Sequence, residues 1–187
     1  MIPAIGPKTS LLSLSLLQQI DLALFNKVFG YGKARQALTQ TALAVSKSGD
    51  GYAQLVSPLL VWLSGSILAP TYALALAVAF SVERFSYYIL KNSLKRLRPC
   101  DLTPSIHSLI TASDKFSFPS GHTSAAFCLC VMTSLMFGGV SAVLFIWAAA
   151  VGLSRVIVGV HFPGDIVAGA LLGSGVALGT ASTLNLW

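Results

Sequence analysis

Hydrophobic residues in this chain gather in five long runs, each near the roughly 20 mostly apolar residues that a membrane-spanning helix needs. Short breaks of polar or small residues separate neighbouring runs, at Ala69-Pro70-Thr71 and at Gly138-Gly139. The pattern predicts an all-α protein, an integral-membrane bundle of five transmembrane helices. The predicted spans are residues 52–69, 71–90, 122–138, 140–158 and 164–184.

The first fifty residues have a different pattern. Residues 9–29 are rich in leucine but also contain Asp21, Lys27 and two glutamines, which suits an amphipathic helix lying in the membrane interface better than a span. Residues 31–47 predict a second such helix, ended by the turn sequence of residues 48–51. We therefore expect one domain over residues 1–187, with interfacial helices in 1–50, a transmembrane bundle in 52–184 and a polar active-site loop at 91–121.

Composition supports a membrane protein. Of the 187 residues, 55% are hydrophobic and only 10% are charged, with a mean hydropathy of +0.77, whereas soluble domains are about 25% charged. These values exclude a soluble domain, a disordered chain, a coiled coil and collagen. The net charge of +6 comes from basic residues beside the apolar runs, which suits anionic headgroups or a phosphorylated substrate. Aromatic residues do not alternate with them, so nucleic acid is not an expected partner.

Small residues within the spans have structural interpretations. Cys128 and Cys130 lie in an apolar run and are expected to pack as small hydrophobic side chains, without the spacing of a zinc site. The last span carries glycine pairs four residues apart, a spacing that lets helices approach closely in lipid. We expect them to pack inside the bundle rather than to form a dimer interface. The pairs are Gly169 with Gly173 and Gly175 with Gly179.

The ionisable residues at the ends of the spans point to a common site. If five spans alternate in direction, the end of the second and fourth spans and the start of the third and fifth all face one side of the membrane. Ionisable groups at such a depth are costly and indicate function. Six of them are expected to converge: Lys91, Arg98, His122, Arg155, His161 and Asp165.

These residue types indicate metal-independent phosphoryl transfer. Lysine and arginine form a phosphate clamp, and Ser120 and Gly121 at a helix N-terminus add backbone N–H donors. One histidine can serve as a nucleophile and the other as a general acid. Asp165 follows His161 by four residues and can fix its tautomer. Because no cluster of carboxylates could hold Mg²⁺ or Ca²⁺, we expect neither a metal nor another cofactor.

Three segments resemble, in order, the motifs of the type 2 phosphatidic acid phosphatase superfamily. They are Lys91-x6-Arg98-Pro99, Pro119-Ser120-Gly121-His122 and Ser154-Arg155-x5-His161-x3-Asp165. The resemblance implies that His161 is the nucleophile that forms a phosphohistidine, that Asp165 orients it and that His122 protonates the leaving group. It also implies a six-helix bundle, one span more than the hydrophobic runs give. The phosphate-binding residues would be Lys91, Arg98, Ser120, Gly121 and Arg155.

The resemblance further implies an enzyme of the bacterial inner membrane that removes phosphate from a lipid phosphate, with undecaprenyl diphosphate as the favoured substrate. Phosphatidylglycerophosphate or phosphatidate as the substrate, a lipid phosphotransferase, and a binder or transporter without turnover are the alternatives. The side of the membrane that the site faces stays open, because related proteins favour the outer side and the positive-inside rule favours the inner side. The oligomeric state is not predicted.

Several other polar residues near the motifs have structural interpretations. Lys95 and Arg96 are expected to be solvated charges, and His107 a loop residue. Because adjacent residues do not face each other on a helix, Glu83 is expected to find a basic partner near the loop while Arg84 extends to the membrane surface. Tyr87 and Tyr88 suit an interfacial aromatic belt.

Overall fold

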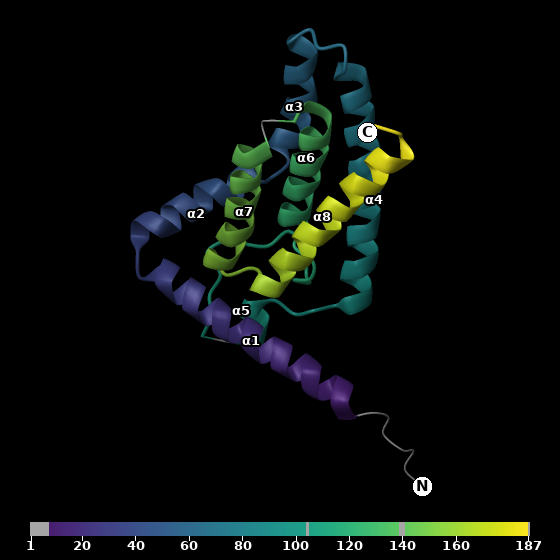
Figure 1. Cartoon of the computed structure of the whole chain (residues 1–187). Helices are drawn as coiled ribbons and strands as arrows, with labels where there is room; N and C mark the ends of the chain where they lie inside the picture. The colour runs from purple at the N-terminus through teal and green to yellow at the C-terminus, as the bar shows by residue number, and fades with distance from the viewer. Residues whose placement is uncertain (1–7, 104, 139–140, 187) are drawn as a thin grey trace.

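The structure is a computed structural model that describes residues 8–103, 105–138 and 141–186. These residues form helices and turns without a strand (Figure 1). The helices are, in chain order, α1 Lys8–Lys33, α2 Gln36–Ser48, α3 Tyr52–Leu63, α4 Ala69–Leu94, α5 Pro99–Leu102, α6 Gly121–Phe137, α7 Ser141–Ile157 and α8 Pro163–Thr183.

An apolar helix forms at each of the five predicted spans. Two of them, α4 and α8, are long and apolar enough to cross a membrane by length and composition, whereas α3, α6 and α7 are shorter apolar helices. The all-helical prediction is confirmed. The number of five membrane crossings stays a prediction, as does a sixth.

The break between the first two spans differs from the one predicted. Residues 69–71 were expected to separate them, but α4 already begins at Ala69 and carries Pro70 in its first turn. A proline is tolerated there because the first N–H groups of a helix have no partner within it. The actual break covers residues 64–68, which follow the end of α3 at Leu63.

The core forms where α4, α6 and α8 meet, with α7 on the other side of α6. Cys128 and Cys130 are both buried there, as expected. Gly169 and Gly173 are packed against α6, because a Cβ atom on Gly173 would lie 2.0 Å from the carbonyl oxygen of Ser124. Around Gly175 and Gly179, a Cβ atom would meet nothing within 4 Å. The expected packing inside the bundle therefore applies to the first pair only.

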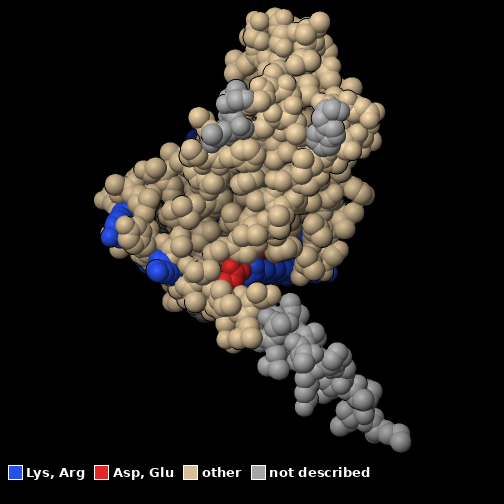
Figure 2. Space-filling model, viewed as in Figure 1, with Lys and Arg blue, Asp and Glu red and all other residues tan. Residues whose placement is uncertain are grey.

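The two N-terminal helices surround one side of the bundle. In Figure 1, α1 passes beneath the lower ends of α7 and α8, and α2 lies beside α7. In the face that Figure 2 shows, most of the visible lysine and arginine surface lies on the lower part of the molecule. The charge is thus concentrated toward the end where the predicted site lies. Interfacial placement of α1 and α2 stays a prediction.

Candidate active site

A cavity of about 870 Å³ opens between α3, α4 and α6 and continues to the loop before α8. Two of the eight predicted site residues, Ser120 and Asp165, do not line it and are fully buried behind its wall. The other six, from four separate parts of the chain, line the cavity together. They are Lys91, Arg98, Gly121, His122, Arg155 and His161.

His161 lies in the short segment between α7 and α8, with Asp165 in the first turn of α8. The Nδ1 atom of His161 is 3.5 Å from Oδ2 of Asp165, so the carboxylate faces this ring nitrogen across a long contact. Asp165 itself is firmly held, because its Oδ2 accepts a hydrogen bond of 2.8 Å from the N–H of Phe162. Because Asp165 faces Nδ1, the other ring nitrogen of His161, Nε2, is left free of this contact. His161 itself lines the cavity.

Arg96 contacts the carboxylate of Asp165, contrary to the prediction of a solvated charge. Its Nη1 donates to Oδ1 of Asp165 at 2.7 Å and its Nη2 donates to Oδ2 of Asp21 at 2.6 Å. Asp21, on α1, also accepts a hydrogen bond from the N–H of Gly164 at 2.7 Å. The sequence could not show this bridge, because its two carboxylates are far apart in the chain. The neighbouring Lys95 is exposed, as expected.

Lys91 and Arg98 direct their donors to one point. Nζ of Lys91 is 2.9 Å and Nη2 of Arg98 is 2.6 Å from Oδ1 of Asp114. Tyr87 adds a third hydrogen bond, from its hydroxyl to Oδ2 of the same carboxylate. The sequence analysis did not identify Asp114, and it assigned Tyr87 to an aromatic belt instead. Two cations and a hydroxyl in this corner of the cavity thus converge on the carboxylate of Asp114.

Arg155 reaches the same cavity from the end of α7. Its side chain is buried, and Nη1 donates to the hydroxyl of Ser46 on α2 at 2.5 Å. The Nε atom of Arg155 is also buried and has no partner among the residues that the structure describes. The guanidinium is therefore anchored to α2 through Nη1, while its Nε makes no hydrogen bond within the described residues.

The N-terminus of α6 forms another wall. A Cβ atom on Gly121 would lie 2.8 Å from the ring of Tyr87, so only glycine allows this approach of α6 to α4. The N–H of Ser120 was expected to bind phosphate, but it donates to the carbonyl oxygen of Asp165 at 3.0 Å. N–H donors for an anion must therefore come from the first turn of α6, which begins at Gly121.

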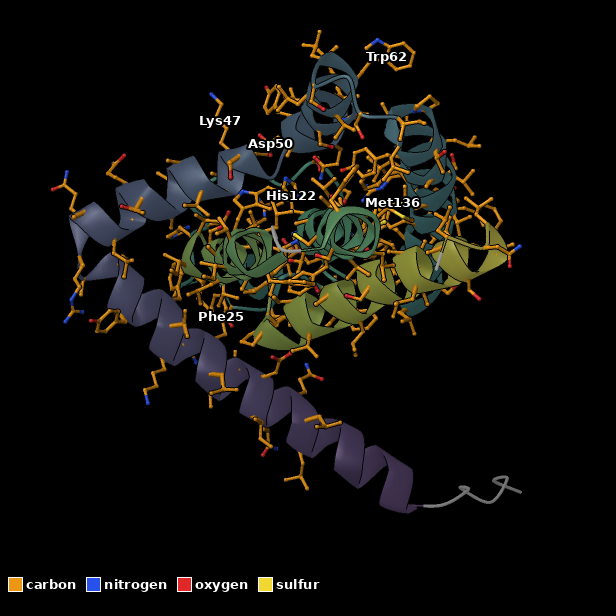
Figure 3. The ribbon with its side chains drawn as sticks, turned by 45° about the horizontal axis from the view of Figure 1, so that its top comes forward. Phe25, Lys47, Asp50, Trp62, His122 and Met136 are labelled. Atoms are coloured by element: carbon orange, nitrogen blue, oxygen red, sulfur yellow. The ribbon has the colours of Figure 1, made fainter. Side chains whose placement is uncertain are left out.

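His122 has a carboxylate partner that the sequence analysis missed. Its Nε2 lies 2.8 Å from Oδ1 of Asp50, in the turn between α2 and α3. Figure 3 shows the two side chains next to each other between these elements and α6. Both histidines of the cavity thus face an aspartate. His107, the third histidine of the chain, is exposed and does not line the cavity.

Glu83 and Arg84 form an ion pair with each other, so the prediction of separate partners was wrong. Nε of Arg84 is 2.7 Å from Oε2 of Glu83, which is fully buried. The arginine side chain is long enough to fold back toward the residue before it, and so it supplies the ion-pair partner of the buried Glu83 carboxylate. Arg84 also lines the cavity.

Burial is the largest influence on the pKa of His161. It lowers the pKa of the imidazole to about 4, against the opposing effect of Asp165. Although burial alone would raise the pKa of Asp114, hydrogen bonds from Tyr87 and Lys91 lower it to about 2. At neutral pH the cavity therefore contains a neutral imidazole at position 161 and an ionised carboxylate at position 114.

The pKa of His161 predicts how stability depends on pH. An unfolded histidine takes up a proton near pH 6.5, whereas the folded protein resists protonation of His161 down to about pH 4. The free energy of unfolding should therefore fall as the pH drops through this window, by about 2 kcal/mol at pH 5. Melting temperatures in detergent should show a weaker pH dependence for His161→Asn than for wild type. His107→Asn is the control, and equal pH dependence in all three proteins would contradict the prediction.

Taken together, these groups suit an anionic phosphate more than a metal. Within the described part of the chain, no group of three or more His, Cys, Asp or Glu side chains is placed to hold a metal ion. The cavity instead joins four cationic side chains, the start of a helix and two histidines.

The chain matches known proteins in sequence and in fold. A family model described as the PAP2 superfamily matches residues 67–186. The undecaprenyl-diphosphatase of Sulfolobus acidocaldarius is 29% identical over 141 residues, which cover 71% of this chain and 64% of that protein. The chain spans about half the length of three other curated relatives that it matches.

Two solved structures have a similar fold. The crystal structure of Aquifex aeolicus LpxE gives a TM-score of 0.74 at 27% identity, covering 87% of this chain and 95% of LpxE. A transmembrane PAP2-type phosphatidylglycerolphosphate phosphatase from Bacillus subtilis gives a TM-score of 0.71 at 22% identity, covering 91% and 87% of the two chains. The family match contains all three sequence motifs and every residue of the predicted site. This chain belongs to the PAP2 superfamily.

Proposed function

We propose that this protein removes phosphate from a membrane lipid phosphate through a phosphohistidine on His161. The carrying observation is the cavity, in which two histidines and three clamp cations meet at one end while apolar side chains line the other end. The apolar end suits a lipid tail, and the polar end suits a phosphate. Membership of the PAP2 superfamily supports the same reaction class.

In the first half of the reaction, neutral His161 attacks the phosphorus through Nε2. The bond from phosphorus to the leaving oxygen breaks, and its electron pair stays on that oxygen, which takes a proton from His122. Asp165 faces Nδ1 of His161, so it stabilises the positive charge that develops on the imidazole ring. Asp50 faces His122 and orients it in the same way.

In the second half, His122 takes a proton from water, and the water oxygen attacks the phosphohistidine. The bond between phosphorus and nitrogen breaks, its electron pair returns to Nε2 of His161, and phosphate leaves. We propose that the phosphate oxygens are held throughout by Lys91, Arg98 and Arg155 and by N–H groups at the start of α6. Ser120 contributes by positioning that helix start. Fixed donors of this kind stabilise charge in the transition state.

We propose undecaprenyl diphosphate as the substrate and undecaprenyl phosphate as the product. The apolar part of the cavity lies between α3 and α4 and is lined by Leu55, Pro58, Ala73, Leu76 and Phe80, which fits an extended hydrocarbon chain. The relative from Sulfolobus acidocaldarius is named for the same substrate. The site would then act at one face of a bacterial inner membrane.

Phosphate release from purified protein in detergent, with a chelator present, tests this function. The panel contains undecaprenyl diphosphate, phosphatidylglycerophosphate, phosphatidate and undecaprenyl phosphate. We expect turnover that resists the chelator, with undecaprenyl diphosphate used best. A preference for phosphatidylglycerophosphate or phosphatidate would correct the substrate. Folded protein without turnover on any of them would contradict the function, and transfer of phosphate to an added alcohol would indicate a phosphotransferase.

A further inference from the structure

Arg84 and Glu83 form a rigid unit on the cavity side of α4. Nε and Nη2 of Arg84 donate to the two carboxylate oxygens of Glu83, at 2.7 and 3.0 Å. Such a bidentate contact fixes the plane of a guanidinium. Glu83 is fully buried, whereas the side chain of Arg84 keeps about half of its surface exposed (51%). The pair therefore presents one face of a fixed guanidinium to the cavity.

This guanidinium lies close to both the clamp and the proposed general acid. Nη2 of Arg84 donates to the carbonyl oxygen of Gly121 at 3.2 Å, and Gly121 directly precedes His122. The guanidinium also lies 4.6 Å from the centre of the Tyr87 ring, and the ammonium of Lys91 lies 4.5 Å from the centre of the same ring. Arg84 and Lys91 thus both contact the ring of Tyr87. Through Gly121, Arg84 also lies next to His122, the proposed general acid.

Beyond Arg84, the cavity becomes apolar. On α4, the residues that line it follow at spacings of three or four and so share one face of the helix. From the apolar end to the clamp they are Ala73, Leu76, Ala77, Phe80, Arg84, Tyr87 and Lys91. Arg84 is therefore the last cation on this face before the apolar part. If the terminal phosphate of a lipid binds to Lys91, Arg98 and Arg155 and its tail lies in the apolar part, the chemical group next to that phosphate lies beside Arg84.

We propose that Arg84 is the binding subsite for the second phosphate of a lipid diphosphate. The proposal rests on the proposed function and explains how the site selects diphosphates. Nη1 of Arg84 takes part in neither the Glu83 nor the Gly121 contact, and it can donate to a phosphate oxygen. When the terminal phosphate moves to His161, the bond to the bridging oxygen breaks and its electron pair stays there. That oxygen then belongs to the lipid monophosphate, whose charge Arg84 binds. A lipid monophosphate instead leaves an alcohol, which offers no anion at this position.

The test compares two substrates with the same hydrocarbon tail, undecaprenyl diphosphate and undecaprenyl phosphate. The quantity is the ratio of their kcat/KM values in detergent, with phosphate release as the readout. Because a hydrogen bond to a charged group is involved, Arg84→Gln should lower the ratio of diphosphate to monophosphate by roughly tenfold to a hundredfold. Lys95→Gln removes an exposed cation outside the cavity and should leave the ratio at the wild-type value.

Two further variants separate binding from folding. Arg84→Gln alone leaves the Glu83 carboxylate buried without its partner, so the double variant Glu83→Gln/Arg84→Gln removes both charges and keeps two amides that can bond to each other. Arg84→Lys keeps a cation beside Glu83 but loses the planar fork. Both should lower the ratio as well.

The outcomes distinguish this inference from the proposed function. A wild-type ratio in the folded Arg84 variants, with both substrates still hydrolysed, would overturn the subsite and leave the lipid phosphatase standing. An equal loss on both substrates would also overturn it, because it would place Arg84 in the general scaffold of the site. Wild-type protein without turnover on either undecaprenyl lipid would overturn the subsite. The lipid phosphatase would be overturned with it only if phosphatidylglycerophosphate and phosphatidate also gave no turnover.

Discussion

His161→Ala is expected to lower phosphate release by at least about 10⁴-fold, because it removes the atom that we propose forms the covalent intermediate. The structure places this side chain, 3% exposed, between the cavity and Asp165. No neighbouring group can replace it, since the other histidine of the cavity faces Asp50. The measurement is turnover of undecaprenyl diphosphate in detergent. Substrate with a radioactive terminal phosphate should also label wild-type protein and leave the variant unlabelled.

His107→Ala is the matched control, because His107 is exposed in the polar loop and lies outside the cavity. It should keep wild-type turnover and wild-type labelling. Full turnover in folded His161→Ala would show that a phosphohistidine at this position is not part of the reaction. Loss of activity with retained labelling would place the covalent phosphate on another residue.

Gly173→Ala is expected to destabilise the protein by about 3 kcal/mol, at the upper end of what overpacking costs. The added Cβ atom would lie 2.0 Å from the carbonyl oxygen of Ser124 and 2.9 Å from the backbone nitrogen of Cys128. Both atoms belong to the backbone of α6, so relief requires α6 and α8 to move apart. The melting temperature in detergent should fall clearly, and activity should fall with it, because the starts of these two helices carry His122 and Asp165.

Gly175→Ala on the same helix is the control. Its Cβ atom would meet nothing within 4 Å, and alanine favours a helix over glycine by up to about 1 kcal/mol. This variant should therefore melt at or above the wild-type temperature. If the two alanine variants melted together, the close contact of α6 and α8 at Gly173 would be wrong.

Much of the fold could be predicted, because a run of apolar residues is a local property. The five runs gave the positions of α3, α4, α6, α7 and α8, with errors at their ends. The error at Pro70 shows the limit, because a proline can begin a helix as well as interrupt one. Which small-residue pair packs inside the bundle was also beyond the sequence. Gly173 and Gly175 differ only in the side of α8 on which they lie.

The sequence by itself determined the chemical types of the site and their order along the chain. The ends of the hydrophobic runs placed Lys91, Arg98, His122, Arg155 and His161 on one side of the predicted bundle, and the structure has all five at one cavity. The tertiary structure alone decided their partners, which come from distant segments. Asp114 meets the clamp, Asp50 meets His122, and Asp21 reaches Asp165 through Arg96. A helix pattern repeats every few residues and can be read locally. An ion pair between residues 16 to 75 positions apart, as here, depends on where the fold brings two side chains together.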